Sequence, residues 1–174
     1  MIKNWLNRLT SPEASVATPS IPTALNQSQL NIERLPILDY GSLCDIAGID
    51  ANLSDWRRLC GVNTDQFDAL YKYAFVRFAE SIQLSPASEA HHHCGPGGLL
   101  THTYEVITIA LRRREGLKLP VGATIAEIHQ KQHLWTYAVF AACLLHDVGK
   151  VMASTRIKVL LENGIERFWT PHGV

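Results

Sequence analysis

An adjacent histidine and aspartate, His146 and Asp147, stand at the polar end of the apolar segment AVFAACLL. Imidazole and carboxylate groups together suit a divalent ion such as Mn, Fe, Zn or Ni, and one carboxylate can bridge two ions. Adjacent side chains on a helix point about 100 degrees apart, so both reach one ion only where the helix ends. Gly149 predicts such an end, because glycine favours the left-handed C-cap. The alternative is a histidine satisfied by backbone carbonyls and an aspartate that forms a local turn.

A second group of histidines lies upstream, in HHHCGPGGLLTH, residues 91–102. Three consecutive histidines at positions 91–93 precede Gly97, Gly98 and His102. Glycine lets the backbone approach another chain segment or a phosphate closely, at an entropic cost that a purely structural loop would not need. We therefore expect this segment to form a wall of the same site. The alternative is that the three consecutive histidines are solvated loop residues.

The charges of the whole chain point to no particular partner, because 16 basic residues balance 16 acidic ones. A nucleic-acid site must then come from local clustering. Arg112, Arg113 and Arg114 form the only basic run, and they could contact DNA phosphates or be a solvated helix end near its own C-terminal dipole. Arg113 shares one helical face with His102, Val106 and Ile109.

The composition, with 47% hydrophobic and 18% charged residues, is typical of one packed globular domain. Residues 1–30 are rich in Ser, Thr, Pro and Asn and predict a flexible tail, which leaves residues 31–174 as the domain. Four scattered cysteines without a CxxC pair favour reduced thiols in the cytoplasm. No apolar run is long enough to span a membrane, so no membrane insertion is expected.

The elements that must position these residues are mainly helices. A first helix begins at Asn63 or Thr64 and buries a stripe made of Phe67, Leu70, Tyr71, Ala74 and Phe78. A second helix covers residues 103–114, and a third, over residues 127–148, is so apolar that we expect it in the centre of the domain. Apolar residues on both sides of Asn163 and Gly164 predict a small β-hairpin.

The segments GGLLTHTYEV and LLHDVGK together resemble the HD superfamily of metal-dependent phosphohydrolases. The resemblance implies an HD-domain-like helical bundle that binds one or two divalent ions (Mn, Fe, Mg, Zn or Ni). It implies His102 as the first metal ligand, His146 and Asp147 as the doublet, and catalytic roles for Asp147 and Lys150. Lys150 would also help hold substrate phosphate.

A narrower resemblance covers residues 80–174, through SIQLSPASEAHHHCGPGGLLTHTYEV, RRREGLKLPVG and WTYAVFAACLLHDVGK. These segments are similar to the N-terminal domain of MobH-type conjugative relaxases, TraI-like proteins of mobile genetic elements that are often described as helicases. The resemblance implies nicking of DNA at a transfer origin, with DNA and the conjugation machinery as partners. The HHxxxGGLLxH part also occurs in YhaM-type exoribonucleases, and in both families His92 and His93 are the matching pair. The candidate substrate-binding residues are therefore His92, His93, Gly97, Gly98, Lys150 and Arg113.

One departure concerns the last metal ligand. The superfamily takes it from an aspartate after the hairpin, and no aspartate follows Asp147 in this chain. We expect a domain truncated at its C-terminal end, which would leave metal weakly bound or absent, or a replacement by Glu162 or Glu166. The leading hypothesis is the N-terminal part of a relaxase that cleaves a phosphodiester bond with a metal. The alternatives are a general HD nuclease or nucleotide phosphohydrolase, and a non-catalytic HD-fold module that binds DNA or protein.

Overall fold

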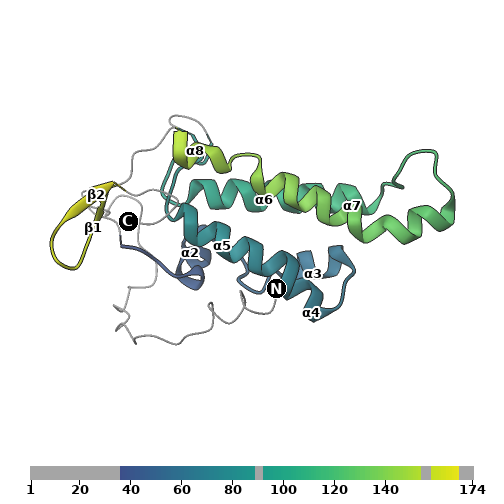
Figure 1. Cartoon of the computed structure of the whole chain (residues 1–174), viewed down its shortest axis with the longest axis horizontal. Helices are drawn as coiled ribbons and strands as arrows, with labels where there is room; N and C mark the ends of the chain where they lie inside the picture. The colour runs from purple at the N-terminus through teal and green to yellow at the C-terminus, as the bar shows by residue number, and fades with distance from the viewer. Residues whose placement is uncertain (1–35, 89–91, 154–157, 169–174) are drawn as a thin grey trace, which may run out of the picture.

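The computed structural model describes residues 36–88, 92–153 and 158–168, which form a mainly helical structure with one small hairpin (Figure 1). In chain order its elements are α2 Tyr40–Ala47, α3 Ser54–Cys60, α4 Thr64–Phe67, the π-helical turn η1 Asp68–Lys72, α5 Tyr73–Ile82, α6 Gly98–Glu115, α7 Ile125–Leu145, α8 Val148–Ala153, β1 Lys158–Leu160 and β2 Glu166–Phe168. The prediction of a mainly α fold with a hairpin near the C-terminus is confirmed. The predicted tail, residues 1–30, lies outside the described residues.

The hairpin forms where an Asn-Gly pair was predicted to turn the chain. Its two strands are antiparallel, and Lys158 pairs with Phe168. Gly164 has a φ of 79°, and the side chain of Asn163 accepts a hydrogen bond from the backbone N–H of Ile165. A left-handed glycine closes such a turn without the steric cost of a side chain.

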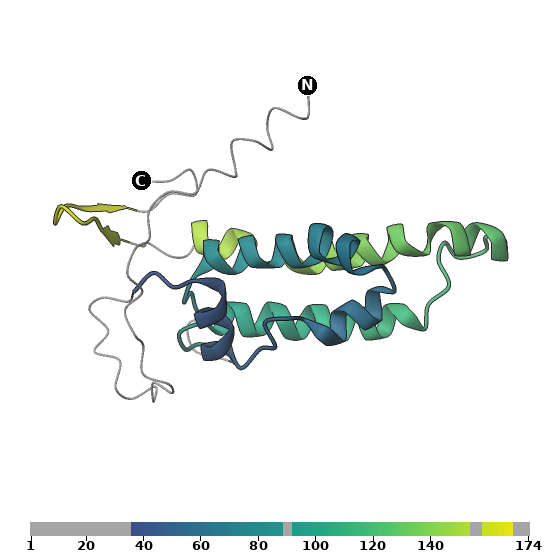
Figure 2. The same ribbon diagram turned by 90° about the horizontal axis from the view of Figure 1, so that it is seen from below.

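Two long helices, α6 and α7, pack along one another, and Figures 1 and 2 show them side by side. Trp56 of α3 is the aromatic centre of the core, fully buried between α5, α6 and α7. Its ring centroid lies 4.8 Å from that of Phe75, 5.0 Å from that of Tyr104 and 6.0 Å from that of Phe140. Each such pair contributes about 0.5–1.5 kcal/mol beyond the area it buries, so this cluster fixes the helices that carry the site.

The first predicted helix is capped as expected but contains a π-helical turn. Asn63 accepts a hydrogen bond from the backbone N–H of Gln66 at 2.9 Å, which confirms the predicted start. The wider turn η1 shifts the register, so the prediction that Leu70 is buried was wrong, and its side chain is 46% exposed. The buried residues of this stretch are Phe67, Tyr71, Phe75, Phe78, Ala79 and Ile82.

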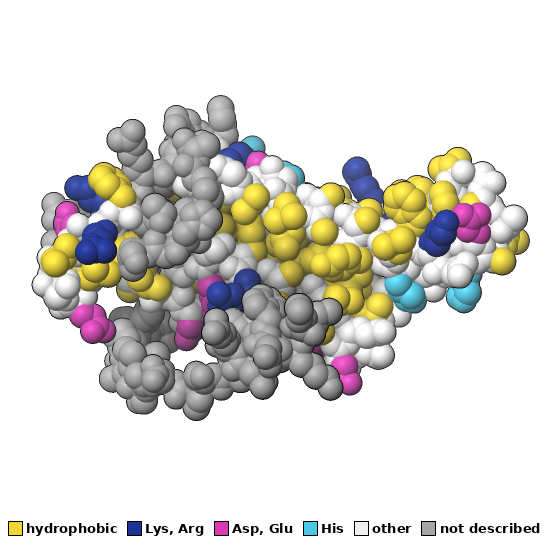
Figure 3. All heavy atoms as spheres, in the orientation of Figure 1, with side chains coloured by type: hydrophobic (Ala, Val, Ile, Leu, Met, Phe, Trp, Pro, Cys, Tyr) yellow, Lys and Arg dark blue, Asp and Glu magenta, His cyan; other side chains and the backbone are white. Residues whose placement is uncertain are grey.

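The third predicted helix is not central to the domain, contrary to expectation. Within α7, which is described throughout, only Thr136, Phe140 and Leu144 are buried. Leu134 and Leu145 are 64% and 57% exposed. Figure 3 shows apolar side chains gathered over the face formed by α5, α7 and the start of α8. A shallow groove in this face is lined by Ala74, Arg77, Phe78, Ser81, Tyr137, Phe140, Ala141, Leu144, Leu145 and Val148. No described helix is long and apolar enough to cross a membrane.

Candidate metal centre

A short step between α7 and α8 carries the adjacent histidine and aspartate. His146 caps α7 in the right-handed region, with φ −59° and ψ −33°, and α8 begins again at Val148. The prediction that Gly149 is a left-handed C-cap was wrong, because Gly149 lies inside α8. The N–H of Lys150 donates to the carbonyl of Asp147, so the new helix starts at once. Because α7 ends here, the side chains of His146 and Asp147 can still both reach one ion, as the sequence analysis required.

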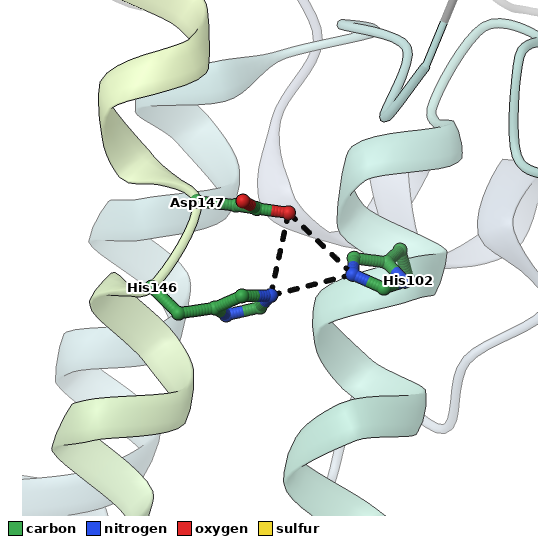
Figure 4. Close-up of side chains that lie close together, drawn as sticks. All are labelled: His102, His146 and Asp147. Carbon is green, nitrogen blue, oxygen red and sulfur yellow. Dashed lines mark hydrogen bonds and ion pairs between the residues drawn. The ribbon is translucent and has the colours of Figure 1, made fainter.

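His102 comes to this step from the first turns of α6, as Figure 4 shows. Its Nε2 lies 3.3 Å from Nε2 of His146 and 3.5 Å from Oδ2 of Asp147. The Nε2 of His146 lies 3.3 Å from the same Oδ2. His102 and His146 are 44 residues apart in the chain, and Asp147 follows His146 directly. The structure therefore brings the three predicted metal ligands into one triangle with nearly equal sides.

The dimensions of this triangle fit a divalent transition metal. An ion with ligand bonds of about 2.0–2.2 Å holds neighbouring donor atoms about 3.0–3.5 Å apart. Two imidazole nitrogens and one carboxylate oxygen form a donor set suited to Fe, Mn or Zn. Three protein ligands also leave coordination positions for other molecules, as catalytic sites do and closed structural sites do not.

A hydrogen bond orients the ring of His146, and partial burial affects the charge of His102. Nδ1 of His146 lies 2.5 Å from the carbonyl oxygen of Cys143, which can only accept, so Nδ1 carries the hydrogen and the lone pair of Nε2 faces the triad. Partial burial lowers the pKa of His102; Asp147 raises it, while His146, His93 and Lys150 lower it further. His102 is therefore held in the neutral form that binds metal.

Lys150 lies beside the triad, as its predicted catalytic role requires. Its Nζ is 2.7 Å from Oδ2 of Asp147, the oxygen that faces both histidines. The same ammonium donates to the carbonyl of Ala87 at 3.2 Å. Lys150 thus joins α8 both to the triad and to the loop that leads to the histidine-rich segment.

The two predicted loop histidines, His92 and His93, lie in different surroundings. The ring of His93 lies beside His102, with 5.7 Å between ring centroids, and its Nε2 is 3.1 Å from Oε2 of Glu105. His92 is exposed, and His91 lies outside the described residues. Sequence reasoning missed Glu105, although its position three residues after His102 places both on one face of α6.

Gly97 and Gly98 are buried where the loop meets α6. The N–H of Gly97 donates to the carbonyl of Leu84, and that of Gly98 to the carbonyl of Gly95. A Cβ on Gly98 would lie 2.0 Å from the carbonyl oxygen of His93. Of the two uses foreseen for these glycines, the structure shows close approach of another chain segment. Their contact with substrate stays a prediction.

Arg113 is not brought to the triad. It follows His102 by eleven residues on α6, which is about 16 Å along the helix axis. Of its neighbours in the basic run, Arg112 pairs with Asp55 at 3.1 Å, and Arg114 is buried and donates to the carbonyls of Leu117 and Gln132. Arg114 therefore has a structural role in joining the ends of α6 and α7.

No further metal-ligating side chain joins the triad within residues 36–88, 92–153 and 158–168. Of the two proposed replacements for the last ligand, Glu166 lies on β2 with its carboxylate 3.7 Å from Nζ of Lys158. Glu162 lies in the turn of the hairpin. Neither belongs to the group around His102, so the described part of the chain supplies three donors.

Comparison with known proteins gives one match. The model of the TraI_2 family, which bears the description "Putative helicase", matches residues 52–173. The matched range contains the triad, Lys150 and the histidine-rich segment. No curated protein and no solved structure matches significantly.

Proposed function

The chain belongs to the TraI_2 family of conjugative-transfer proteins, and we propose that it is part of a MobH-type relaxase that nicks DNA at a transfer origin. We assign the cleavage to a metal-dependent HD-type site made of His102, His146 and Asp147. The observation that carries the proposal is the triangle of donor atoms 3.3–3.5 Å apart, with the Lys150 ammonium 2.7 Å from one of them.

Each residue of this site has a separate task. His102 and His146 supply ring nitrogens and Asp147 supplies a carboxylate oxygen. A divalent ion held there would supply Lewis-acid activation of a water and of a phosphoryl oxygen. Lys150 places positive charge beside the group that binds there, where it offsets charge on a phosphate. The hydrogen bond from His146 to Cys143 keeps the imidazole in the orientation that the triad needs.

The substrate in this proposal is DNA, and the partners are the other proteins of conjugative transfer. Family membership supports both. The family description mentions a helicase, but the 174 residues contain no GxxxxGK[ST] loop of the kind that cradles nucleotide phosphates in P-loop motors. The proposal therefore rests on the triad.

The test combines metal content with DNA cleavage. The purified chain, reconstituted with Mn²⁺ or Fe²⁺, is analysed for bound metal beside His102→Ala and His146→Ala variants, with His129→Ala as a matched histidine control. With Mn²⁺ or Fe²⁺ supplied in excess, bound metal in the wild type and control, and its loss in both triad variants, is the expected result. Nicking of supercoiled plasmid with a transfer origin, but not of one without it, separates a relaxase from a general nuclease. Absence of metal in every variant would instead favour the non-catalytic module.

A further inference from the structure

We propose that Glu105 is a positioning residue that holds the imidazole of His93 beside the triad, so that Nδ1 of His93 accepts a hydrogen bond from a water molecule there. The inference rests on the proposed phosphodiesterase function and deepens it, because it identifies residues that orient the attacking water. It also separates His93 from His92, which the sequence pattern leaves equivalent.

The contact between Glu105 and His93 determines which nitrogen of the ring is available. Oε2 of Glu105 lies 3.1 Å from Nε2 of His93. A carboxylate can only accept, so Nε2 carries the hydrogen of this bond. In the neutral ring Nδ1 then holds a lone pair and accepts hydrogen bonds. The bond to the carboxylate thus fixes both the tautomer and the orientation of the ring.

The backbone of His93 is braced from several sides. Its φ of 61° is a left-handed conformation that disfavours a side chain, and such strain persists only where the surroundings impose it. Its carbonyl oxygen accepts a hydrogen bond from the N–H of Ala87 and lies against Gly98, where only a glycine fits. The carbonyl of Ala87 in turn accepts from Lys150. The loop, α6 and α8 therefore jointly fix the place of this one histidine.

The position of His93 suits a water-orienting residue better than a ligand of the ion. Its ring lies 5.7 Å from that of His102, centroid to centroid, yet it does not join the group of donor atoms within 4.8 Å of one another. His93 therefore lies next to the triad without belonging to it. The exposed side chain of His92 lacks a comparable hydrogen bond within the described residues.

The first arm of the test measures the orientation of His93 without any metal. Nuclear magnetic resonance of the wild-type chain should show a slowly exchanging Nε2–H signal of His93 and a nuclear Overhauser contact between the rings of His93 and His102. Glu105→Ala should lose both signals and Glu105→Gln should retain the ring contact, because its amide oxygen also accepts. The matched control is Glu115→Gln on the same helix. An unchanged ring contact in Glu105→Ala would overturn the proposal.

The second arm measures hydrolysis of bis(p-nitrophenyl) phosphate by the Mn²⁺-loaded chain. Glu105→Ala and His93→Ala should each lower kcat by about tenfold to a hundredfold, in the range of lost proton-transfer or orienting groups. KM and Mn²⁺ affinity should change by less than about twofold, because in this proposal His93 contacts the attacking water and neither His93 nor Glu105 binds the ion or the substrate phosphate. The double variant should lose no more than His93→Ala alone, and His129→Ala, a histidine variant outside the site, should retain activity.

The two arms separate this inference from the proposed function. If the wild-type chain has no phosphodiesterase activity, the proposed function fails, and the role of Glu105 is still decided by the ring contact. If His93→Ala is inactive while Glu105→Ala is fully active, Glu105 is not a positioning residue. A rise in KM at constant kcat, or loss of Mn²⁺ in His93→Ala, would overturn the water-orienting role.

Discussion

Nζ of Lys150 lies 2.7 Å from Oδ2 of Asp147, the oxygen that also faces the Nε2 atoms of His102 and His146. An ion that binds the triad must therefore share this oxygen with an ammonium group or displace it. We expect Lys150→Met to raise the affinity for Mn²⁺ by about twofold to fivefold, since a half-exposed ion pair is worth up to about 1 kcal/mol. Isothermal titration calorimetry measures this affinity.

The matched control for that change is Lys131→Met, which removes an ammonium that lies 2.8 Å from Glu127 on the same face of α7 and far from the triad in sequence. Its Mn²⁺ affinity should equal that of the wild type. Weaker binding in Lys150→Met would mean that the ammonium supports the bound state and does not compete with the ion.

Substitution of glycine by alanine should have opposite effects on the free energy of unfolding at Gly98 and at Gly149. Gly98→Ala places a Cβ 2.0 Å from the backbone of His93 and should lower the free energy of unfolding by roughly 2 kcal/mol or more. Gly149 lies in α8 with no atom near its Cβ position, so Gly149→Ala should raise that free energy by about 0.5–1 kcal/mol. Urea denaturation of both variants provides the comparison, and equal stabilities would contradict the tight contact at Gly98.

Asp147→Ala should abolish metal binding and change the melting temperature by less than about 4 °C. The carboxylate contacts two histidines and Lys150, none of which belongs to the buried core, and the ammonium keeps its bond to Ala87 after the change. Calorimetric melting without metal checks the fold, and elemental analysis checks the site. A variant that unfolds would show that Asp147 is structural.

Thr108→Val tests the hydrogen bond inside the aromatic core. Oγ1 of Thr108 accepts from Nε1 of the buried Trp56 at 2.8 Å, and valine of the same shape leaves this N–H without a partner. The expected cost is about 1–3 kcal/mol in the free energy of unfolding. Thr101→Val is the control, because the hydroxyl of Thr101 donates to the carbonyl of Gly97, the N-cap residue of the same helix. Similar costs for both variants would argue against a special role for the Trp56 contact.

The buried thiol of Cys60 predicts a loss of stability in alkali. Burial raises the pKa of Cys60 from 9.0 to about 12, against a smaller lowering by its hydrogen bond to Tyr71. Because the folded pKa exceeds the unfolded one, its stabilising contribution is complete below about pH 9 and is lost as pH rises towards about 12. Urea denaturation at about pH 8 and about pH 11 should show this decline, and Cys60→Ala should show less of it. In the folded state, exposed Cys94 should react with thiol reagents before Cys60 does.

Local sequence signals predicted the type of most elements correctly. Asn63 caps a helix as its side chain indicates, and the Asn-Gly pair at 163 and 164 closes the hairpin. The errors arose where tertiary packing overrides a regular repeat. One π-helical turn exposes Leu70, which was predicted to be buried. The apolar composition of α7 led to the wrong prediction of a central position, because the described fold buries only Thr136, Phe140 and Leu144 of that helix.

His102, His146 and Asp147 could be named as candidate metal ligands because the segments around them resemble the HD superfamily, whereas an adjacent histidine and aspartate alone left a structural alternative open. The distances between these three side chains could not be predicted from the sequence, because they depend on how α6 packs against α7. A helix end was predicted near Gly149, but the restart of the chain as α8 was not, because a C-cap and a helical restart differ only in backbone angles near Gly149. Glu105 was not predicted as a site residue, because a lone glutamate on a helix is usually solvated.

The gap between the residues of the triad along the chain has a mechanical meaning. His102 and His146 are separated by 44 residues, and an ion bound to both would cross-link α6 and α7 much as a disulfide would. In the chain-entropy account, closing a loop of that size stabilises the folded state by roughly 4 kcal/mol. The metal-loaded chain should then resist pulling forces that separate these two helices, and removal of the ion should abolish this resistance.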